Sequence, residues 1–308
     1  MDYFNFIGKN PNTYALGFLF CSNPCDKRSP DLDYQVEYSI IKDTKYSVYL
    51  FSLEDLLDYN RVPKLPQNSY KTMLIYRGWI LSPEKYQTLY DNLLSQGYVL
   101  INDFNQYINC HLLPNWYEKV INYTPYSEWT TNLDDTSIIE ILSHFGKSPL
   151  IVKDYVKSRK HEWHEACYIE NAFEIESSLK IIHTFLERQE PLTGGLVLRK
   201  YIELLPIGYH EKSNLRLSRE YRVFYLFGKV LCIIDYWGRL SNSIDFNTNE
   251  YQWVQSFGDI FDSNFFTIDF ARKIDGSLIV IEIGDGQVSG LQGFNEKIFY
   301  SKLISILA

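Results

Sequence analysis

Residues 266–286 read FTIDFARKIDGSLIVIEIGDG, two apolar runs that each contain one carboxylate. Asp269 and Glu282 lie within runs typical of buried strands, and Asp275-Gly276 supplies a turn between them. Because an isolated buried charge is costly, each carboxylate needs a partner. On neighbouring antiparallel strands the two would converge on one Mg²⁺ that also takes phosphate oxygens. The alternative is a pair of strand-end acids, each in a salt bridge with a surface lysine or arginine.

A lysine ends another apolar strand upstream. Residues 150–153 read LIVK, and the following segment, which contains Lys157, Arg159 and Lys160, has little core character. Ammonium and guanidinium groups at a strand end beside a loop are suited to neutralising polyphosphate oxygens. A solvated, charged loop would explain the same residues.

A third charged feature is Arg-Glu-Tyr-Arg at 219–222, which opens the apolar run YRVFYLFGKVLCI. Side chains alternate along a strand, so Glu220 and Arg222 share one face. This face would present an acid and an arginine toward a cleft. A cross-paired ion pair on an exposed strand face is the competing interpretation.

The N-terminal third contains a strand–helix–strand pattern. Thr72–Tyr76 is predicted as a strand, Ser82-Pro83 as the start of a helix that ends at Gly97, and Tyr98–Ile101 as the next strand. This order predicts a parallel sheet with flanking helices. Arg77 follows the first strand, at the sheet edge where ligands bind in open parallel sheets. A glycine turn with an incidental arginine is the alternative.

Composition excludes some classes of partner and compartment. The 308 residues carry 30 Lys and Arg against 38 Asp and Glu, a net charge of −8, which disfavours nucleic acid as a partner. The five cysteines are scattered, no secretory signal is evident at Met1–Asn10, and no apolar run is long enough for a bilayer. We therefore expect a cytoplasmic protein with reduced thiols and no membrane contact.

Several common motifs are missing or incomplete. The chain has no GxxxxGK[ST] loop and no GxGxxG associated with a strand. His161 and His164 are three residues apart, whereas the zinc-protease pattern needs four. Cys21 and Cys25 have no second cysteine pair nearby, so a zinc ribbon is not expected.

Taken in order, these features resemble the ATP-grasp superfamily, and within it the clade named for two arginines and a lysine. The resemblance covers about Leu74 to Phe294. Its most specific stretches are VKDYVKSRKHEWHEA at 152–166 and IEIGDGQVSGL at 281–291. It implies an α/β (α+β) chain, an ATP-grasp fold with an N-terminal Rossmann-like pre-ATP-grasp domain.

We place the first domain boundary within 102–131, where Pro114 and Pro125 stand among scattered polar residues. The resulting domains are 1–120, the pre-ATP-grasp domain, and 121–308, the ATP-grasp domain. The resemblance implies two α+β subdomains in the second, with a hinge near 198–203.

The resemblance also assigns roles to individual residues. Lys153 and Arg222 are the catalytic candidates, facing phosphate groups, and Leu198–Ile202 would receive adenine. Asp269 and Glu282 match the Mg²⁺ ligands, and Asp285 is a substitute third ligand because Gly284 stands where the superfamily has asparagine. The predicted ATP contacts are Lys153, Lys160, Leu198, Lys200, Tyr201, Ile202, Glu203 (for the ribose) and Glu220. Arg77 and Arg159 are candidates for contacts with the substrate.

The function implied is that of a carboxylate–amine or carboxylate–thiol ligase that uses ATP and Mg²⁺ through an acyl-phosphate. Its partners would be a carboxylate and a nucleophile, either of which belongs to a small molecule, a peptide or a protein tail. A kinase on the same scaffold and a non-catalytic ATP-binding module are the alternatives. The sequence leaves the substrate and the oligomeric state open.

Overall fold

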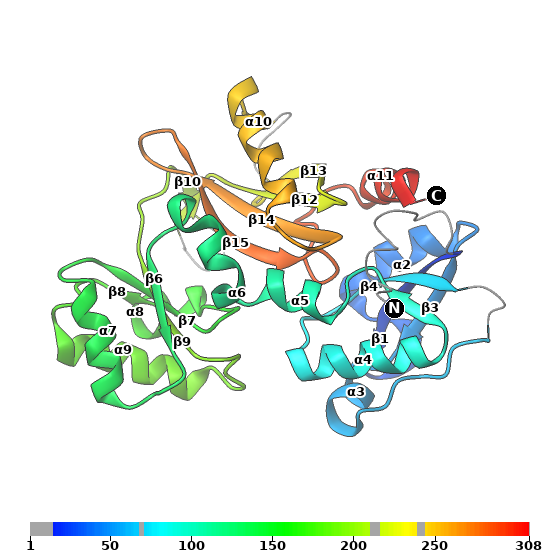
Figure 1. Cartoon of the computed structure of the whole chain (residues 1–308), viewed down its shortest axis with the longest axis horizontal. Coiled ribbons are helices and arrows are strands. Elements are labelled where there is room, and N and C mark those ends of the chain that lie inside the picture. Colours follow the sequence, from blue (N-terminus) through cyan, green and yellow to red (C-terminus); the bar gives the residue numbers. More distant parts are fainter. Residues whose placement is uncertain (1–14, 68–70, 210–215, 239–243, 308) are drawn as a thin grey trace. The chain divides into compact units, whose positions relative to one another are not determined.

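The computed structural model describes residues 15–67, 71–209, 216–238 and 244–307, which form two compact units. Unit 1 comprises residues 1–110, 222–267 and 284–308, and unit 2 comprises 111–221 and 268–283. Figure 1 shows the elements of both units in chain order by colour. The first division, between Cys110 and His111, falls inside the segment in which the sequence predicts a boundary.

Unit 1 contains a mainly parallel sheet. Its parallel strands lie in the order β3-β1-β4-β5, and a short strand pairs antiparallel with the end of β1. The strands are β1 (Ala15–Asn23), β2 (Asp26–Pro30), β3 (Ser47–Phe51), β4 (Thr72–Arg77) and β5 (Tyr98–Leu100). The predicted strand–helix–strand unit is confirmed, because β4 and β5 are parallel neighbours joined by α4 (Pro83–Ser95).

The helices of unit 1 begin where the sequence predicts them. Ser52 caps α3 (Leu53–Tyr59), since its hydroxyl accepts from the Asp55 amide at 3.1 Å. Ser82 caps α4 in the same way, and Gly97 follows that helix with a φ of 86°, which favours glycine.

Apolar clusters cover both faces of this sheet. On one face, residues of β1 and β4 pack with α2 (Gln35–Lys42) and α11 (Glu296–Leu307), and on the other with α3 and α4. The members at the centre are Phe18, Phe20, Ile75, Ile41 and Phe299 on the first face, and Leu19, Leu74, Tyr76, Leu56 and Leu89 on the second.

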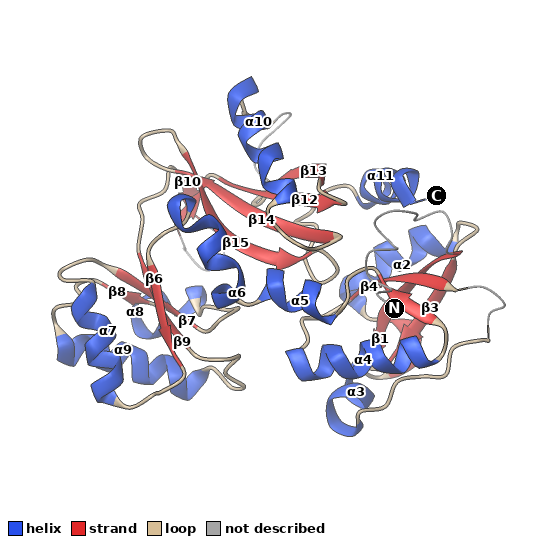
Figure 2. Cartoon of the chain, in the orientation of Figure 1, coloured by secondary structure: helices blue, strands red, loops and turns tan. Residues whose placement is uncertain are grey.

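Unit 2 contains an antiparallel sheet in the order β6-β9-β7-β8. The strands are β6 (Ser127–Thr130), β7 (Leu150–Lys153), β8 (Tyr168–Ile169) and β9 (Leu196–Lys200). Two helices, α7 (Asp135–His144) and α9 (Ile175–Arg188), lie beside one face of this sheet, as Figure 2 shows. Leu150, Val152, Leu196 and Leu198 form the core beneath these helices.

A third sheet has the order β13-β12-β14-β15, and the division between the units crosses β12, β14 and β15. These strands are β12 (Glu220–Leu226), β13 (Lys229–Asp235), β14 (Phe265–Arg272) and β15 (Leu278–Asp285). The remaining elements are η2 (Leu32–Tyr34), α5 (Phe104–His111), α6 (Leu113–Tyr117), η3 (Glu118–Tyr123), η4 (Lys160–Glu162), α8 (Trp163–Ala166), β10 (Pro206–Tyr209), β11 (Arg216–Ser218), α10 (Thr248–Ser256) and η5 (Phe257–Asp259).

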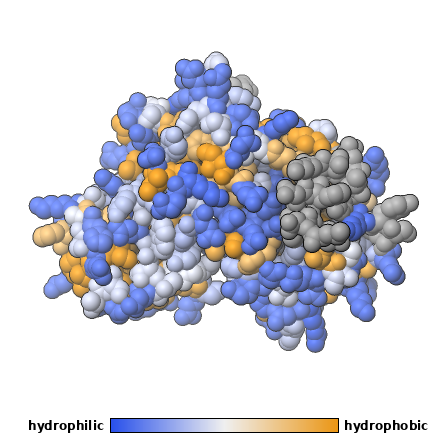
Figure 3. Space-filling model, viewed as in Figure 1, coloured by the Kyte–Doolittle hydropathy of each residue, from blue (hydrophilic) through white to orange (hydrophobic). Residues whose placement is uncertain are grey.

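On the face shown in Figure 3, hydrophobic residues form small patches among hydrophilic ones. Within the described ranges, every helix is too short or too polar to cross a membrane.

Candidate functional site

One face of the unit 2 sheet carries the charged residues. Opposed residues on paired strands share a face, and side chains alternate along each strand. Leu198 and Val152 are partners in the helix-covered core, so Arg199 and Lys153 point to the opposite face. Tyr168 joins them, because it is opposite Ile151, which in turn is opposite Arg199.

Lys153 and Glu282 form an ion pair on this face. The Lys153 Nζ donates to Glu282 Oε2 at 2.5 Å, and the lysine side chain is only 4% exposed. Burial lowers the pKa of Lys153, and the Glu282 carboxylate opposes that shift. The second oxygen, Glu282 Oε1, is buried and has no hydrogen-bond partner among the described residues.

Arg199 is a second buried cation beside this pair. Its Nη2 donates to Thr124 Oγ1 and to the Ile281 carbonyl, both at 2.7 Å. Its Nη1 is buried without a hydrogen-bond partner in the described part of the chain. Burial lowers the pKa of Arg199, and Glu282 acts in the opposite direction. An unpaired buried donor costs free energy, which a bound oxyanion would recover.

His111 reports the sign of the local field. It is buried, and its pKa is lowered to about 3, first by burial and then by the charges of Lys157 and Lys153. The imidazole is therefore neutral near pH 7. Although the whole chain is acidic, this part of unit 2 is electropositive and suits an anionic ligand.

Three half-buried aromatic rings lie together in unit 2. Trp163 stacks on Tyr168 with ring centres 5.1 Å apart, and Tyr201 meets both rings edge-on. Tyr201 directly follows β9, so the cluster lies at the predicted hinge. Aromatic faces of this kind stack on planar bases.

The other predicted hinge residues contribute differently. The Leu198 side chain belongs to the helix-covered core, and Lys200 and Glu203 are exposed. Ile202 is half-buried. Of the predicted hinge residues 198–203, Tyr201 is the one whose side chain joins the aromatic cluster, so any role of Leu198 would depend on its backbone.

Asp154 orders the loop that follows Lys153. Its Oδ1 accepts from the amides of Val156 and Lys157 at 2.7 and 2.5 Å, and its Oδ2 accepts from Gln189 and Thr193. Asp154 is fully buried, so the loop starts from a fixed point.

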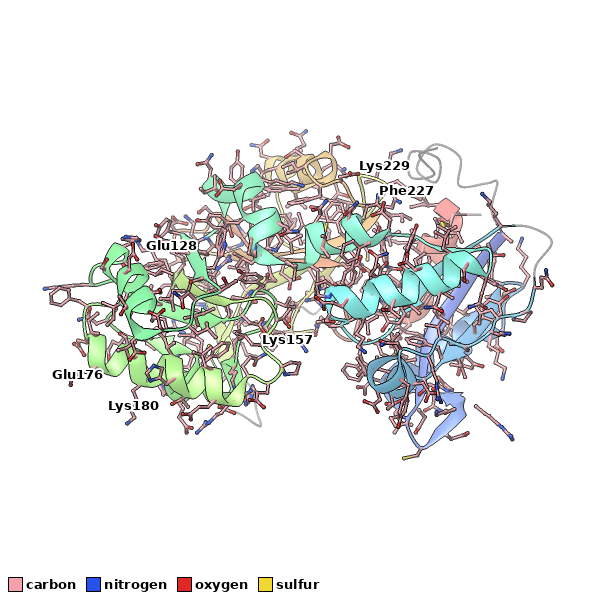
Figure 4. All side chains as sticks on the ribbon, turned by 60° about the horizontal axis from the view of Figure 1, so that its bottom comes forward. Glu128, Lys157, Glu176, Lys180, Phe227 and Lys229 are labelled. Carbon is pink, nitrogen blue, oxygen red and sulfur yellow. The ribbon has the colours of Figure 1, made fainter. Side chains whose placement is uncertain are left out.

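Two predicted loop residues differ in exposure. Arg159 is held by Glu162, with Nη2 to Oε1 at 2.5 Å, and by the Arg188 carbonyl at 2.7 Å. Lys160 is exposed in the turn that follows. Figure 4 shows Lys157 on this loop, while Glu176 and Lys180 project from α9.

The predicted carboxylates and Arg222 divide between the units. Asp269 and Glu282 lie in unit 2 on β14 and β15, which are neighbouring strands as the sequence predicts. Glu220 is buried in unit 2 and accepts from Ser218 Oγ at 2.7 Å. Arg222 belongs to unit 1, where Nη1 donates to the Gly290 carbonyl at 3.1 Å and the guanidinium lies over Tyr236.

Arg77 is engaged inside unit 1. It is fully buried and its fork binds Glu37 at 2.9 and 3.1 Å, while Nη1 donates to the carbonyls of Gly286, Gln287 and Ser289. With its donors occupied by the protein, Arg77 holds unit 1 together instead of contacting substrate.

Asp285 is also internal to unit 1. Asn102 Nδ2 donates to its Oδ2 at 2.5 Å and the Gln287 amide to its Oδ1 at 2.8 Å. Burial raises the pKa of Asp285 to about 7, and these hydrogen bonds limit the rise. A fully buried carboxyl that is already bonded on both oxygens is a poor third metal ligand, so we retain Asp269 and Glu282 alone.

The donor set fits Mg²⁺ in part. Two carboxylates plus ligand phosphates are a usual coordination for this ion, and Glu282 Oε1 is available. No group of three or more histidine, cysteine, aspartate or glutamate side chains suited to a metal occurs in the described residues. The protein would therefore bind Mg²⁺ together with phosphate oxygens and not alone.

A family model matches residues 141–303, more than half of the chain, and describes the ATP-grasp domain of family 3 in the clade named for two arginines and a lysine. The chain belongs to this ATP-grasp family. The matched range contains Lys153, Arg199 and Glu282, which form the charged cluster of unit 2. No curated protein sequence matched the chain significantly.

Solved structures show the same fold at low sequence identity. The ATP-grasp ligase PsnB, complexed with precursor peptide PsnA2 and AMPPNP, has a TM-score of 0.56 and 12% identity, covering 96% of this chain and 98% of PsnB. D-cycloserine synthetase DcsG has 0.59 and 11%, covering 95% and 99%. D-alanyl-alanine synthetase A from Vibrio cholerae O1 biovar eltor str. N16961 has 0.55 and 10%, covering 96% and 99%. The mixed α/β ATP-grasp fold with an N-terminal parallel-sheet domain is thus confirmed.

Arg199 is the main site residue that the sequence interpretation missed. It stands in LVLRK as one charge in an apolar strand, the same signal that identified Asp269 and Glu282. What was lacking was the pairing with β7, which puts Arg199 and Lys153 on one face.

Proposed function

We propose that this ATP-grasp protein is an Mg-ATP-dependent ligase that activates a carboxylate as an acyl-phosphate and transfers it to an amine or thiol. The observation that carries the proposal is the cluster of Lys153, Arg199 and Glu282. Arg199 and Glu282 each keep one buried polar atom without a partner in the described part of the chain. A donor and an acceptor left open beside a buried lysine suit a phosphate group and its counterion.

The chain's own groups act by charge and position. Lys153 and Arg199 would hold phosphate oxygens, and Arg222 would stabilise the transferred phosphoryl group when the site is complete. Phosphoryl transfer to a carboxylate needs in-line alignment and charge neutralisation more than a dedicated base. The neutral His111 is therefore not required to accept a proton.

Asp269 and Glu282 would hold Mg²⁺. When bound, this ion neutralises charge on the β- and γ-phosphates. Glu282 would then exchange its ion pair with Lys153 for the metal, leaving Lys153 to the phosphates.

The aromatic cluster supports adenine binding at the hinge. Trp163, Tyr168 and Tyr201 offer ring faces and edges beside the backbone of 198–202, whose amides and carbonyls suit the base edge. Trp163 lies at the end of the loop that Asp154 orders, so closure of this loop over a nucleotide would exclude water.

The substrate class is a matter for a panel of candidates. Among the solved relatives, one ligase is complexed with a precursor peptide and two others are named for synthesising D-cycloserine and D-alanyl-alanine. We therefore propose amino acids and peptides as the first carboxylates and amines to try.

Calorimetric titration with Mg-ATP tests the binding site. We expect Lys153→Met and Glu282→Gln each to weaken affinity at least about tenfold, because each loses a charge-assisted contact. Lys180→Met and Glu176→Gln make the same chemical changes on exposed α9 and should bind normally. If the wild type binds no nucleotide, the proposal fails.

Product analysis tests the reaction. Release of ADP and phosphate that needs both a carboxylate and an amine or thiol, with a ligated product, supports the ligase. A stable phosphorylated product without ligation would instead identify a kinase.

The donor set supports a second candidate, a non-catalytic ATP-binding module. With Asp285 internal to unit 1, the described residues offer two carboxylates where the superfamily uses a third ligand. Tight Mg-ATP binding without turnover across the panel would favour this alternative.

A further inference from the structure

Thr124 connects the buried arginine of the site to a neighbouring strand. Its side chain is 7% exposed. Its hydroxyl donates to the Val280 carbonyl at 2.9 Å and accepts from Arg199 Nη2 at 2.7 Å. A hydroxyl carries a single hydrogen, so this one fixes its direction by donating to β15 and presents a lone pair to the arginine.

Arg199 is held on three sides. Nη2 uses both hydrogens, one to Thr124 Oγ1 and one to the Ile281 carbonyl. The guanidinium carbon lies 5.7 Å from the ring centre of the fully buried Trp116. Such a ring contact fixes the plane of the guanidinium.

This arrangement leaves one end of the fork for a ligand. With Nη2 saturated, Nη1 is the nitrogen that has buried hydrogens and no protein acceptor in the described ranges. An arginine already fixed in place loses little side-chain entropy when it binds an oxyanion.

We propose that Thr124 is a positioning residue that directs Arg199 Nη1 toward an ATP phosphate oxygen. The inference rests on the proposed nucleotide site and adds to it a residue that lies outside the matched family range 141–303. Thr124 would not itself contact the nucleotide. Without its lone pair, Nη2 would compete with Nη1 for the ligand and the arginine would adopt several orientations.

Three substitutions at position 124 separate the hydroxyl from its shape. Thr124→Val keeps the branched shape and removes the lone pair, Thr124→Ser keeps the hydroxyl, and Thr124→Ala removes the lone pair with less bulk. Ser127→Ala is the matched control, since Ser127 is also buried in unit 2 and its hydroxyl donates to the Pro125 carbonyl at 3.0 Å.

The measurement is the Kd for Mg-ATP by calorimetry on the full chain, in the wild-type and Arg199→Met backgrounds. We expect Thr124→Val to weaken binding about five- to tenfold, with Thr124→Ser and Ser127→Ala within about twofold of wild type. In the Arg199→Met background, Thr124→Val should add no further loss, because there is no arginine left to orient.

Two results would overturn the inference. Normal binding by Thr124→Val, while Arg199→Met binds weakly, would show that Arg199 needs no positioning. An equal loss in both backgrounds would show that Thr124 acts only through general structure. If Thr124→Val does not fold, Thr124→Ala against Thr124→Ser gives the same decision. Failure of the nucleotide site itself is recognised separately, because Lys153→Met and Arg199→Met would then bind as the wild type does.

Discussion

Arg77 and Arg199 are both buried arginines, one in each unit, and their surroundings differ in the way that matters for function. Arg77 binds Glu37 through two nitrogens and three carbonyls through the third, so its fork is saturated. Arg199 saturates only Nη2 and leaves Nη1 without a partner in the described chain.

The pKa shifts of the two arginines have opposite directions for the same reason. Burial acts to lower the pKa of Arg77, but the Glu37 carboxylate outweighs it and the pKa rises. Burial lowers the pKa of Arg199, and Glu282, already paired with Lys153, does not compensate. A buried charge is thus no sign of function by itself; a buried charge whose hydrogen bonds are incomplete is.

The largest effect expected from this contrast is on stability in unit 1. Arg77→Met should lower the free energy of unfolding by about 3–5 kcal/mol, because Glu37 would keep a buried charge without its partner. Urea denaturation measures the loss. Lys27→Ala breaks the exposed pair with Asp55 and should cost less than about 1 kcal/mol. A small effect of Arg77→Met would remove the distinction between the two arginines.

The second prediction concerns Asp285, whose carboxyl lies beside the segment that Arg77 binds. Its pKa is raised by burial to about 7, above the ordinary value of 3.8. The proton is therefore held more tightly in the folded state, and the associated stability is full below about pH 4 and lost as pH rises through about 7.

Denaturation of wild type and Asp285→Asn across pH 4–8 measures this effect as a difference, since other titrating groups are shared. Relative to the variant, the wild type should lose about 2–4 kcal/mol between pH 4 and 7. Asp285→Asn should also carry a constant cost, because it puts an amide donor against Asn102. A difference that does not vary with pH would contradict the burial argument.

These two residues also show where sequence interpretation stops. Arg77 is a site candidate because it follows an apolar strand, as functional residues in open sheets often do, and Asp285 because it stands next to the missing asparagine. Their partners Glu37 and Asn102 are 40 and 183 positions away, and no local pattern indicates those contacts. Strand ends were predictable; the partner that meets each side chain was not.

Lys153, Asp269 and Glu282 were predictable because a charge within an apolar strand demands a partner whatever the tertiary structure. The same rule applied to Arg199, but its face is determined by pairing with β7, which the sequence does not reveal. The parallel order of β4 and β5 could be read from the strand–helix–strand pattern, since its caps and its Gly97 turn are local.

The third prediction sharpens the comparison from the side of unit 2, where the missing partners should arrive with the ligand. Mg-ATP at a hundred times its Kd should raise the free energy of unfolding by about 2.7 kcal/mol. Lys153→Met and Arg199→Met should lose most of this gain, whereas Arg77→Met should retain it although its starting stability is lower. Thermal denaturation with and without Mg-ATP gives the comparison, and an equal gain in all four proteins would place the nucleotide elsewhere.

The smallest effect is expected when the first substitution is repeated at the other arginine. Arg199→Met removes one hydrogen bond each from Thr124 and the Ile281 carbonyl, which together cost about 1–3 kcal/mol. It also removes a buried charge with an unsatisfied nitrogen, and the methionine side chain can pack on Trp116. These terms oppose each other, so the free energy of unfolding should change by less than about 1 kcal/mol in the absence of nucleotide. Because the substitution is the same at both sites, urea denaturation of Arg77→Met and Arg199→Met tests the comparison directly. Equal losses would mean that Arg199 stabilises the fold as Arg77 does, and its open Nη1 would no longer point to a ligand.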